Sequence, residues 1–202
     1  MRKVVGVGCV LLGVVCILIS IGFAVYNGYE AKKAEKTSQA LLLDVQTNMC
    51  PQEITPEETG AQTVQEPAPR QMQTVTVGAY DSIGVLTIPV LELELPVMTD
   101  WNYEKLKSAP CHYYGSCYEA DFVIAAHNYP SHFGRLSQLQ AGDLVIFTDV
   151  TGESHGYEVI LLETLAATAT EEMISSGFDL SLYTCTPGGG NRVTVRCRAV
   201  KE

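Results

Sequence analysis

The stretch "LSLYTCTPGGGNRVTVRCRAV", Leu180 to Val200, decides the fold expected for the C-terminal part of the chain. Two runs, Leu180–Cys185 and Arg192–Val200, alternate apolar and polar residues on either side of "TPGGGN". Alternation with a period of two is typical of half-buried strands, and a glycine-rich link suits a hairpin connection. We therefore predict two adjacent strands whose neighbouring ends carry Cys185 and Arg192.

The same alternation separates the two cysteines of this stretch. Cys185 shares its strand face with Tyr183, and this face is the more polar one. Cys197 lies on the apolar face of its own strand, opposite Arg196 and Arg198. Because successive side chains of a strand point to opposite faces, Cys185 is predicted to face a cleft and Cys197 the core. Arg196 and Arg198 are interpreted as exposed strand arginines.

Five more segments upstream have the composition of short strands: Ser82–Pro89, Leu91–Val97, Asp121–His127, Leu144–Asp149 and Gly156–Thr164. Seven short strands after Ala79 predict a closed barrel or a sandwich. Three segments can form short helices: Trp101–Ala109, Gly134–Leu139 and Ala169–Gly177, the last with Thr170 as a possible N-cap. The fold class is all-β with short helices.

The N-terminus contains an apolar segment. Val4 to Val25 is almost wholly apolar and as a helix would span roughly 33 Å, enough to cross a bilayer. A cleaved signal peptide is the alternative, but its apolar region is usually about 7 to 15 residues long. Arg2 and Lys3 precede the segment, and the positive-inside rule then places residues 1–3 in the cytoplasm. We predict a retained transmembrane anchor over residues 4–26.

The remainder divides into two parts. Residues 27–78 begin with helix formers and continue with scattered prolines and polar residues, which predicts a juxtamembrane helix and a polar stalk. Residues 79–202 form the predicted extracellular domain. The whole chain carries 13 basic and 23 acidic residues, a formal net charge of −10, which argues against nucleic acid as a partner.

Cys185 has the setting of a nucleophile. A thiol nucleophile needs an acid or base and a group that stabilises an oxyanion. Among the histidines (His112, His127, His132 and His155), His127 ends the strand "DFVIAAH" just as Cys185 ends its own strand. Arg192 opens the next strand, and its guanidinium can donate two parallel hydrogen bonds. Cys185, His127 and Arg192 are the candidate catalytic residues.

These residues resemble the sortases, cysteine transpeptidases of Gram-positive bacterial surfaces. The resemblance covers about Ile83 to Val200, and its motifs occur in the family's order: "IGVLTIPVLELELPV", "YYGS", "FVIAAHN", "LSQLQAGDLVIF" and "LYTC", followed by the arginine of the last strand. It implies the sortase-like eight-stranded β-barrel. The chain departs from the usual Gly-His at Ala126 and His127, so the sortase class is left open.

The resemblance also implies a mechanism and partners. Cys185 would be the nucleophile, His127 the general acid and base, and Arg192 the oxyanion or substrate-positioning group. The substrates would be surface proteins with a C-terminal LPxTG-like sorting motif, which is cleaved through a thioacyl enzyme. The amine acceptor would be a peptidoglycan precursor or a pilin subunit, and the enzyme would work at the outer face of the cell membrane.

Parts of the sequence are also compatible with two other functions. A non-catalytic, membrane-tethered β-barrel that binds peptides or cell-wall components is the alternative from another class. An L,D-transpeptidase is disfavoured, because the Ser-His-Gly-Cys motif of that family is imitated by "SHGY", where Tyr157 replaces the nucleophile.

The remaining cysteines, the acidic residues and the segment before the last two strands carry further predictions. Cys111 and Cys117 could form a disulfide or remain two thiols. No cofactor or metal is predicted, because the acidic strand residues are equally well explained as solvated positions: Glu92, Glu94, Glu153 and Glu158. By its position in the family fold, the segment Leu165 to Phe178 is predicted to shape the substrate groove with Met173 and Ile174.

Overall fold

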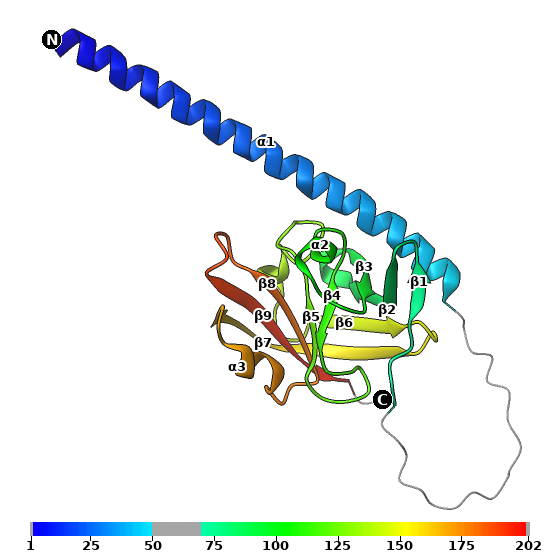
Figure 1. Ribbon diagram of the computed structural model, residues 1–202. Helices are drawn as coiled ribbons and strands as arrows, with labels where there is room; N and C mark the ends of the chain where they lie inside the picture. Colours follow the sequence, from blue (N-terminus) through cyan, green and yellow to red (C-terminus); the bar gives the residue numbers. More distant parts are fainter. Residues whose placement is uncertain (1, 50–69, 201–202) are drawn as a thin grey trace, which may run out of the picture.

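The computed structural model describes residues 2–49 and 70–200. Within them it contains one long helix and nine strands (Figure 1): α1 Arg2–Asn48, β1 Val75–Val77, β2 Tyr80–Ile88, β3 Leu93–Met98, β4 Cys111–Tyr114, β5 Phe122–Ala125, β6 Leu144–Asp149, β7 Ser154–Ala166, β8 Leu180–Cys185 and β9 Asn191–Ala199. The short helices are η1 Pro89–Leu91, α2 Tyr103–Leu106, η2 Leu136–Gln138 and α3 Thr170–Ile174. All seven predicted strands are present, and β1 and β4 are additional.

Strands β2 to β9 close into a barrel. They pair in the order β2-β3-β4-β5-β8-β9-β7-β6, and β6 pairs again with β2. Strand β1 adds to the outside of this ring by pairing with β2. Full closure leaves no unpaired edge among the eight barrel strands. The eight-stranded barrel predicted from the sequence is therefore confirmed.

Closure of the barrel requires a glycine in β2. This strand pairs with β3 and β6, and its register against β3 shifts between Ser82 and Gly84. Gly84 has a φ of +153°, and a Cβ at this position would lie 2.2 Å from the carbonyl oxygen of Thr148. Only a residue without a side chain allows β6 to approach so closely.

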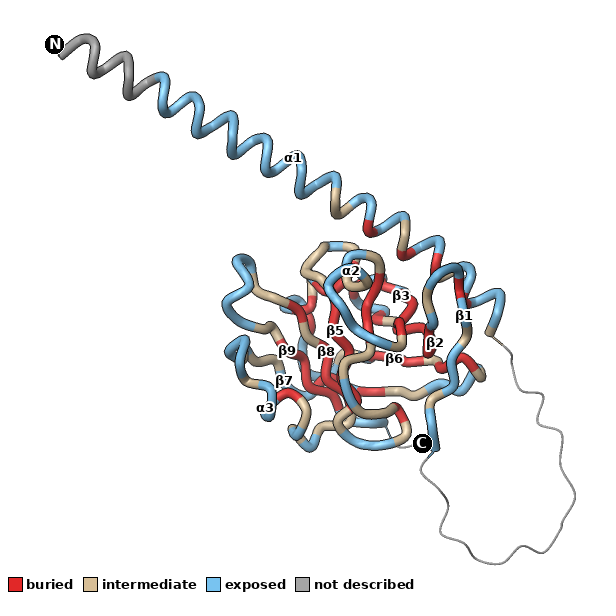
Figure 2. The backbone as a smooth tube through the Cα atoms, in the orientation of Figure 1, coloured by how far each residue is buried: buried red, intermediate tan, exposed pale blue. Residues whose placement is uncertain are grey.

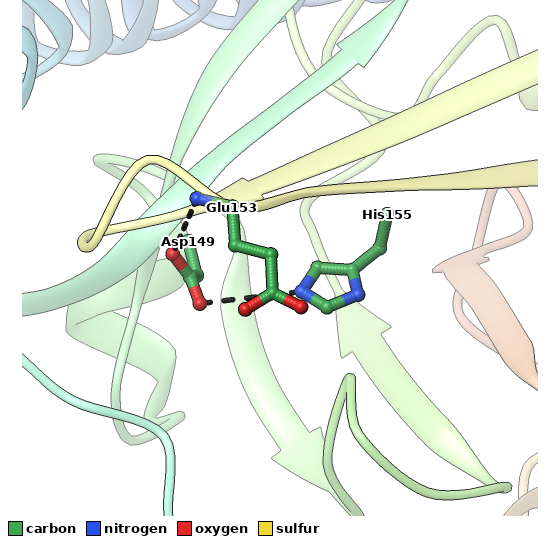
Figure 3. A group of neighbouring side chains, drawn as sticks. All are labelled: Asp149, Glu153 and His155. Atoms are coloured by element: carbon green, nitrogen blue, oxygen red, sulfur yellow. Dashed lines mark hydrogen bonds and ion pairs between the residues drawn. The ribbon is translucent and has the colours of Figure 1, made fainter. Parts of the chain in front are cut away.

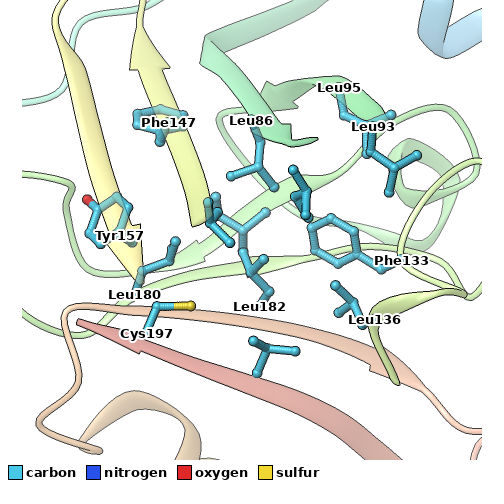
Figure 4. Packing of buried hydrophobic residues seen from close by; sticks show 14 of the residues in the cluster. Leu86, Leu93, Leu95, Phe133, Leu136, Phe147, Tyr157, Leu180, Leu182 and Cys197 are labelled. Carbon is cyan, nitrogen blue, oxygen red and sulfur yellow. The ribbon is translucent and has the colours of Figure 1, made fainter. Parts of the chain in front are cut away.

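The barrel interior is filled by apolar side chains from every barrel strand except β4 (Figure 4). Leu86, Phe147 and Leu182 have no exposed surface, and Cys197 is likewise completely buried. Burying a side chain of the size of leucine contributes roughly 2 kcal/mol to stability. The prediction that Cys197 belongs to the core is confirmed.

The long helix α1 belongs partly to this folded unit. Its apolar part is long enough to cross a membrane, with a mean hydropathy of 2.1. Its C-terminal part packs on β1, β2 and β3, and Figure 2 shows buried positions only in that part. The buried residues recur at helical spacing, namely Ala34, Ser38, Leu41 and Val45.

The start of the folded unit thus differs from the expected boundary at Ala79. Strand β1 lies before this residue, and Leu41 and Val45 form a second apolar cluster with Val77 and Val85. The physical reason is that α1 covers apolar side chains on the outside of the barrel, which would otherwise face water. Most of the predicted stalk lies outside the described residues.

The short helices differ in detail from the sequence-based predictions. Helix α2 has a single turn, and the side chain of its N-cap Asn102 accepts a hydrogen bond of 2.8 Å from the Lys105 amide. The N-cap of α3 is Ala169, so Thr170 is already the first helical residue and the predicted cap is wrong.

Cys111 and Cys117 are free thiols, so the possible disulfide is not formed. Cys111 packs in the cluster under α1, whereas Cys117 packs in the barrel core. Both thiols are buried among apolar neighbours in separate places, which explains why six residues of separation do not bring them together.

Candidate active site

Three strand ends meet at one end of the barrel. Strands β5 and β8 run parallel, and Ala125 is paired with Tyr183. Two residues further along each strand lie His127 and Cys185, so the register brings both to the same end. Strand β9 starts beside them, with Arg192 paired directly to Cys185. We call this end, with these three residues, the open rim.

The pairing is held by hydrogen bonds that extend beyond β5. The Ala126 amide donates to the Tyr183 carbonyl oxygen at 3.2 Å. The Thr184 hydroxyl donates to the Ala126 carbonyl oxygen at 2.9 Å. These two bonds fix the backbone on both sides of the step from β5 to His127. A site built on paired strands holds its side chains more firmly than one built on a free loop.

A cleft of about 230 Å³ opens at this rim. Cys185 and Arg192 both line it. Its walls are mainly apolar and aromatic: Trp101, Tyr103, Leu106, Tyr113, Ala125, Ala126, Ala166, Ala167, Ala169, Thr170, Met173 and Tyr183. The Tyr113 ring packs against Tyr183 and Trp101 at centroid distances of 5.4 and 5.6 Å. Such a cleft suits a peptide with apolar side chains.

Cys185 differs from the other cysteines of the barrel in accessibility. It is half-buried, whereas Cys111, Cys117 and Cys197 are buried. Burial raises the pKa of each of these three thiols to about 12, because the thiolate is poorly solvated there. The thiolate is the nucleophilic form of cysteine, so these three are inert at neutral pH. Cys185 is the barrel thiol that a reagent or substrate can reach.

Arg192 lies beside the thiol but is bent toward the turn after β8. One of its terminal nitrogens donates hydrogen bonds to the carbonyl oxygens of Gly189 and Asn191, at 3.0 and 3.1 Å. Among the described residues, no hydrogen bond joins Arg192, Cys185 and His127 to one another. The second terminal nitrogen of the guanidinium is left as a donor for a group in the cleft.

His127 is half-buried at the rim, outside the set of residues that line the cleft. Its ring stacks on Tyr129 with a centroid distance of 4.5 Å and an angle of 18°. The Phe133 amide donates to the His127 carbonyl oxygen, which closes the loop after β5. Tyr129 was missed by sequence analysis, because its position depends on this loop.

The other histidines have different surroundings. Both ring nitrogens of His112 contact carbonyl oxygens, those of Thr99 and Gly115. His132 is completely buried, and burial, with a smaller contribution from His127, lowers its pKa to about 4. His155 lies 4.0 Å from Asp149, where β6 and β7 connect. His127 is therefore the histidine that lies at the open rim with Cys185.

Arg196 is buried, so its interpretation as an exposed strand arginine is wrong. Only 2% of the residue is exposed. It pairs with Glu163 at 2.7 Å, bonds the Ser181 hydroxyl at 2.8 Å, and donates to the carbonyl oxygens of Glu172 and Met173. The reason for the burial is that the segment containing α3 folds over this face of β9.

This arrangement fixes one wall of the cleft. Met173 lines the cleft as predicted, whereas the predicted Ile174 does not. Arg196 holds the α3 backbone by donating a hydrogen bond to the Met173 carbonyl oxygen. The other end of the segment is held by Asp121, whose carboxylate accepts hydrogen bonds from the Ser176 and Gly177 amides at 2.8 and 3.0 Å. The wall is thus a fixed part of the barrel surface.

A second group of polar residues lies near the turn between β6 and β7 (Figure 3). The possible ligand atoms of Asp149, Glu153 and His155 lie within 4.8 Å of one another. Asp149 already accepts hydrogen bonds from the hydroxyl of Tyr118 and from the Glu153 amide. Glu153 forms an ion pair with Arg70. The carboxylates of Asp149 and Glu153 are therefore already bonded to donors of the protein itself. We interpret the group as a hydrogen-bond network that stabilises the turn between β6 and β7.

Comparison with known proteins identifies the family. Residues 86–200 match the family model described as "Sortase domain". This is more than half of the chain, and the chain therefore belongs to the sortase family, which is known for cysteine transpeptidases. No curated protein is similar enough to count as a match.

Solved structures show the same fold. Sortase A from Corynebacterium diphtheriae is 23% identical, with a TM-score of 0.55; the match covers 61% of this chain and 62% of that one. A Clostridium perfringens sortase D5 transpeptidase is 19% identical, with a TM-score of 0.53 and coverages of 59% and 79%. A complex of Streptococcus agalactiae sortase C1 and MTSET is 24% identical, with a TM-score of 0.52 and coverages of 60% and 68%. The chain spans less than two thirds of the corynebacterial protein.

Proposed function

We propose that this sortase-family protein is a membrane-anchored cysteine transpeptidase that acts on sorting motifs resembling LPxTG. The observation that carries the proposal is the half-buried Cys185, which lines an apolar cleft directly beside Arg192 while the other three barrel thiols are buried. His127 arrives at the same rim through the parallel pairing of β5 with β8.

In the proposed reaction, the Cys185 thiolate attacks the carbonyl carbon of the scissile amide. The oxyanion that develops is stabilised by Arg192, and the departing amine takes a proton from His127. The carbon–nitrogen bond breaks, and the acyl group remains on Cys185 as a thioester. An incoming amine, which gives its proton to His127, then attacks the thioester and releases the thiolate.

The proposed organisation of the chain follows the sequence. Residues 1–3 would lie in the cytoplasm and residues 4–26 in the membrane. Residues 27–78 would connect the span to the barrel, and residues 79–202 would hold the catalytic machinery outside the cell. The acceptor would be an amine of a peptidoglycan precursor or of a pilin subunit, and the donor a surface protein with a C-terminal sorting motif.

The test measures cleavage and transpeptidation of fluorogenic sorting-motif peptides by the full chain in detergent micelles, with an amine acceptor. The full chain is needed because α1 covers part of the barrel. Cys185→Ala is expected to lose at least about 1000-fold in activity, as nucleophile removal does in other covalent enzymes. Cys117→Ala is the matched control and is expected to retain activity.

The natural protein could instead fail to cleave any of the peptides, and Cys185 could fail to react with a thiol reagent. These two results together would favour the non-catalytic binding protein. MTSET is a suitable reagent, because the S. agalactiae sortase C1 has been solved in complex with it.

A further inference from the structure

The barrel meets α1 very close to the end of its apolar segment. The described side chains of α1 are exposed from Leu11 to Tyr29, and the first partly covered residue is Glu30. Glu30 lies five positions after Val25, which is a rise of about 7.5 Å in an α-helix. Helix α1 continues without a break from Arg2 to Asn48. If the apolar segment crosses a bilayer, the barrel therefore begins at the level of the lipid headgroups.

The segment that follows His127 lies beside α1. Pro130, Ser131 and Arg135, in the segment after His127, line a groove together with Glu35 and Ser38 of α1. Figure 1 shows α2 beneath the C-terminal half of α1.

Glu30 of α1 lies within electrostatic range of α2 and of the segment after His127. Hydrogen bonding to Glu104 raises the pKa of Lys107 at the end of α2, and the Glu30 charge adds to this effect. Burial raises the pKa of Tyr129, and Glu30 again contributes.

The surface around α2 has the composition of a membrane interface. Trp101 is 40% exposed and Tyr103 is 73% exposed, and their rings pack against each other at 5.6 Å. Tryptophan and tyrosine favour the boundary between lipid and water, because they combine an apolar ring with a polar group. Nearby lysines are paired, Lys105 with Asp100 and Lys107 with Glu104, so the surface carries no excess charge.

We propose that this surface, the α2 edge formed by Trp101, Tyr103, Lys105 and Lys107, rests on the headgroup region of the bilayer that α1 crosses. Trp101 and Tyr103 also line the cleft with Cys185. The cleft then opens at the membrane surface, where it can receive peptides that are themselves held near the membrane. Because the charges of the α2 edge are balanced, zwitterionic lipid is sufficient for this contact.

The chain contains a single tryptophan, so Trp101 fluorescence reports on this surface alone. The full chain is reconstituted in nanodiscs of phosphatidylcholine, with or without bromine on the upper acyl carbons. We expect Trp101 to lose much of its emission in the brominated lipid and to be protected from aqueous acrylamide relative to the protein in a bilayer-free denaturant.

A matched control moves the tryptophan to the far end of the barrel. Tyr114 is 46% exposed and pairs with Val123 near the start of β5, away from the open rim. The double variant Trp101→Tyr and Tyr114→Trp is expected to be insensitive to brominated lipid and open to acrylamide.

Two results would overturn the proposal. One is a Trp101 emission unaffected by brominated lipid, and the other is equal quenching of the two proteins. Emission does not depend on catalysis, so either result leaves the proposed transpeptidase function untouched. The proposal rests only on the predicted anchor and on the position of α1.

Discussion

The barrel holds the same three reactive residue types in two different settings. The open rim contains one cysteine, one arginine and one histidine, namely Cys185, Arg192 and His127. A second set of the same residue types, here called the sealed set, is buried elsewhere in the fold: Cys197, Arg196 and His132. The members of the sealed set are at most 2% exposed.

The two arginines both lie on β9, and each is paired with a residue of β8. Cys185 pairs with Arg192 at the ends of β8 and β9, and four residues further the Ser181–Arg196 pair lies under the α3 segment. Residue type therefore does not determine chemical role in this barrel. What differs is whether a neighbouring segment covers the side chain and satisfies its polar atoms.

The largest contrast is expected between the two cysteines of β8 and β9. Burial raises the pKa of Cys197 from 9.0 to about 12, so its thiolate fraction at neutral pH is about 1000-fold below that of an ordinary thiol. MTSET labelling of the full chain, followed by peptide mass spectrometry, should modify Cys185 long before Cys197. In denaturant both should react alike. Equal labelling in the folded protein would break the comparison.

The second contrast concerns stability. Arg196→Met removes four hydrogen bonds and leaves the Glu163 carboxylate, whose side chain is 32% exposed, without its partner. Breaking a buried ion pair costs about 3 kcal/mol of unfolding free energy. Denaturant unfolding followed by Trp101 fluorescence measures the loss. Arg198→Met is the control on an exposed neighbour, and a similar small effect of both variants would contradict the assigned role of Arg196.

The third contrast is catalytic. Arg192→Ala should lower kcat/KM about 100-fold, the typical cost of one oxyanion donor, while the unfolding free energy stays close to that of the natural protein. Arg192→Lys should recover part of the activity, because it keeps the charge but loses the planar fork. Steady-state kinetics with a sorting-motif peptide provide the test. If Arg192→Ala lowered the unfolding free energy but kept a normal kcat/KM, Arg192 would have a structural role and not the proposed catalytic one.

The smallest contrast concerns the histidines and pH. The pKa of His132 is lowered from 6.5 to about 4, so between these values the unfolded chain binds the proton that the folded protein excludes. Stability should therefore fall as pH falls, by about 2 kcal/mol between pH 7 and pH 5.

His132→Phe keeps a ring of similar size and should remove this part of the pH dependence. Unfolding curves of both proteins at the two pH values give the difference. An unchanged pH slope in the variant would show that His132 is not the responsible group.

Much of the fold and of the open rim could be predicted from local patterns. Alternation in "LSLYTC" and "RVTVRCRAV" indicates which cysteine faces the cleft, and the glycine-rich turn indicates that Arg192 starts beside Cys185. Both features depend on residues close together in the sequence.

The errors arise where distant segments meet. Strand parity gives the face of Arg196 but not the segment that covers it, so its burial could not be predicted. The same holds for α1, whose buried face includes the small residues Ala34 and Ser38 and has no strong apolar pattern. Tyr129 reaches His127 only because the loop after β5 brings the two rings together.

The most direct test of the proposed function is to trap the acyl enzyme. The full chain is mixed with a sorting-motif peptide without an amine acceptor, quenched in acid, and analysed by intact and peptide mass spectrometry. The account predicts a mass increase equal to the acyl fragment of the peptide, located on Cys185 and removed by hydroxylamine. Peptide cleavage that proceeds with no adduct on Cys185, and that persists in Cys185→Ala, would contradict it.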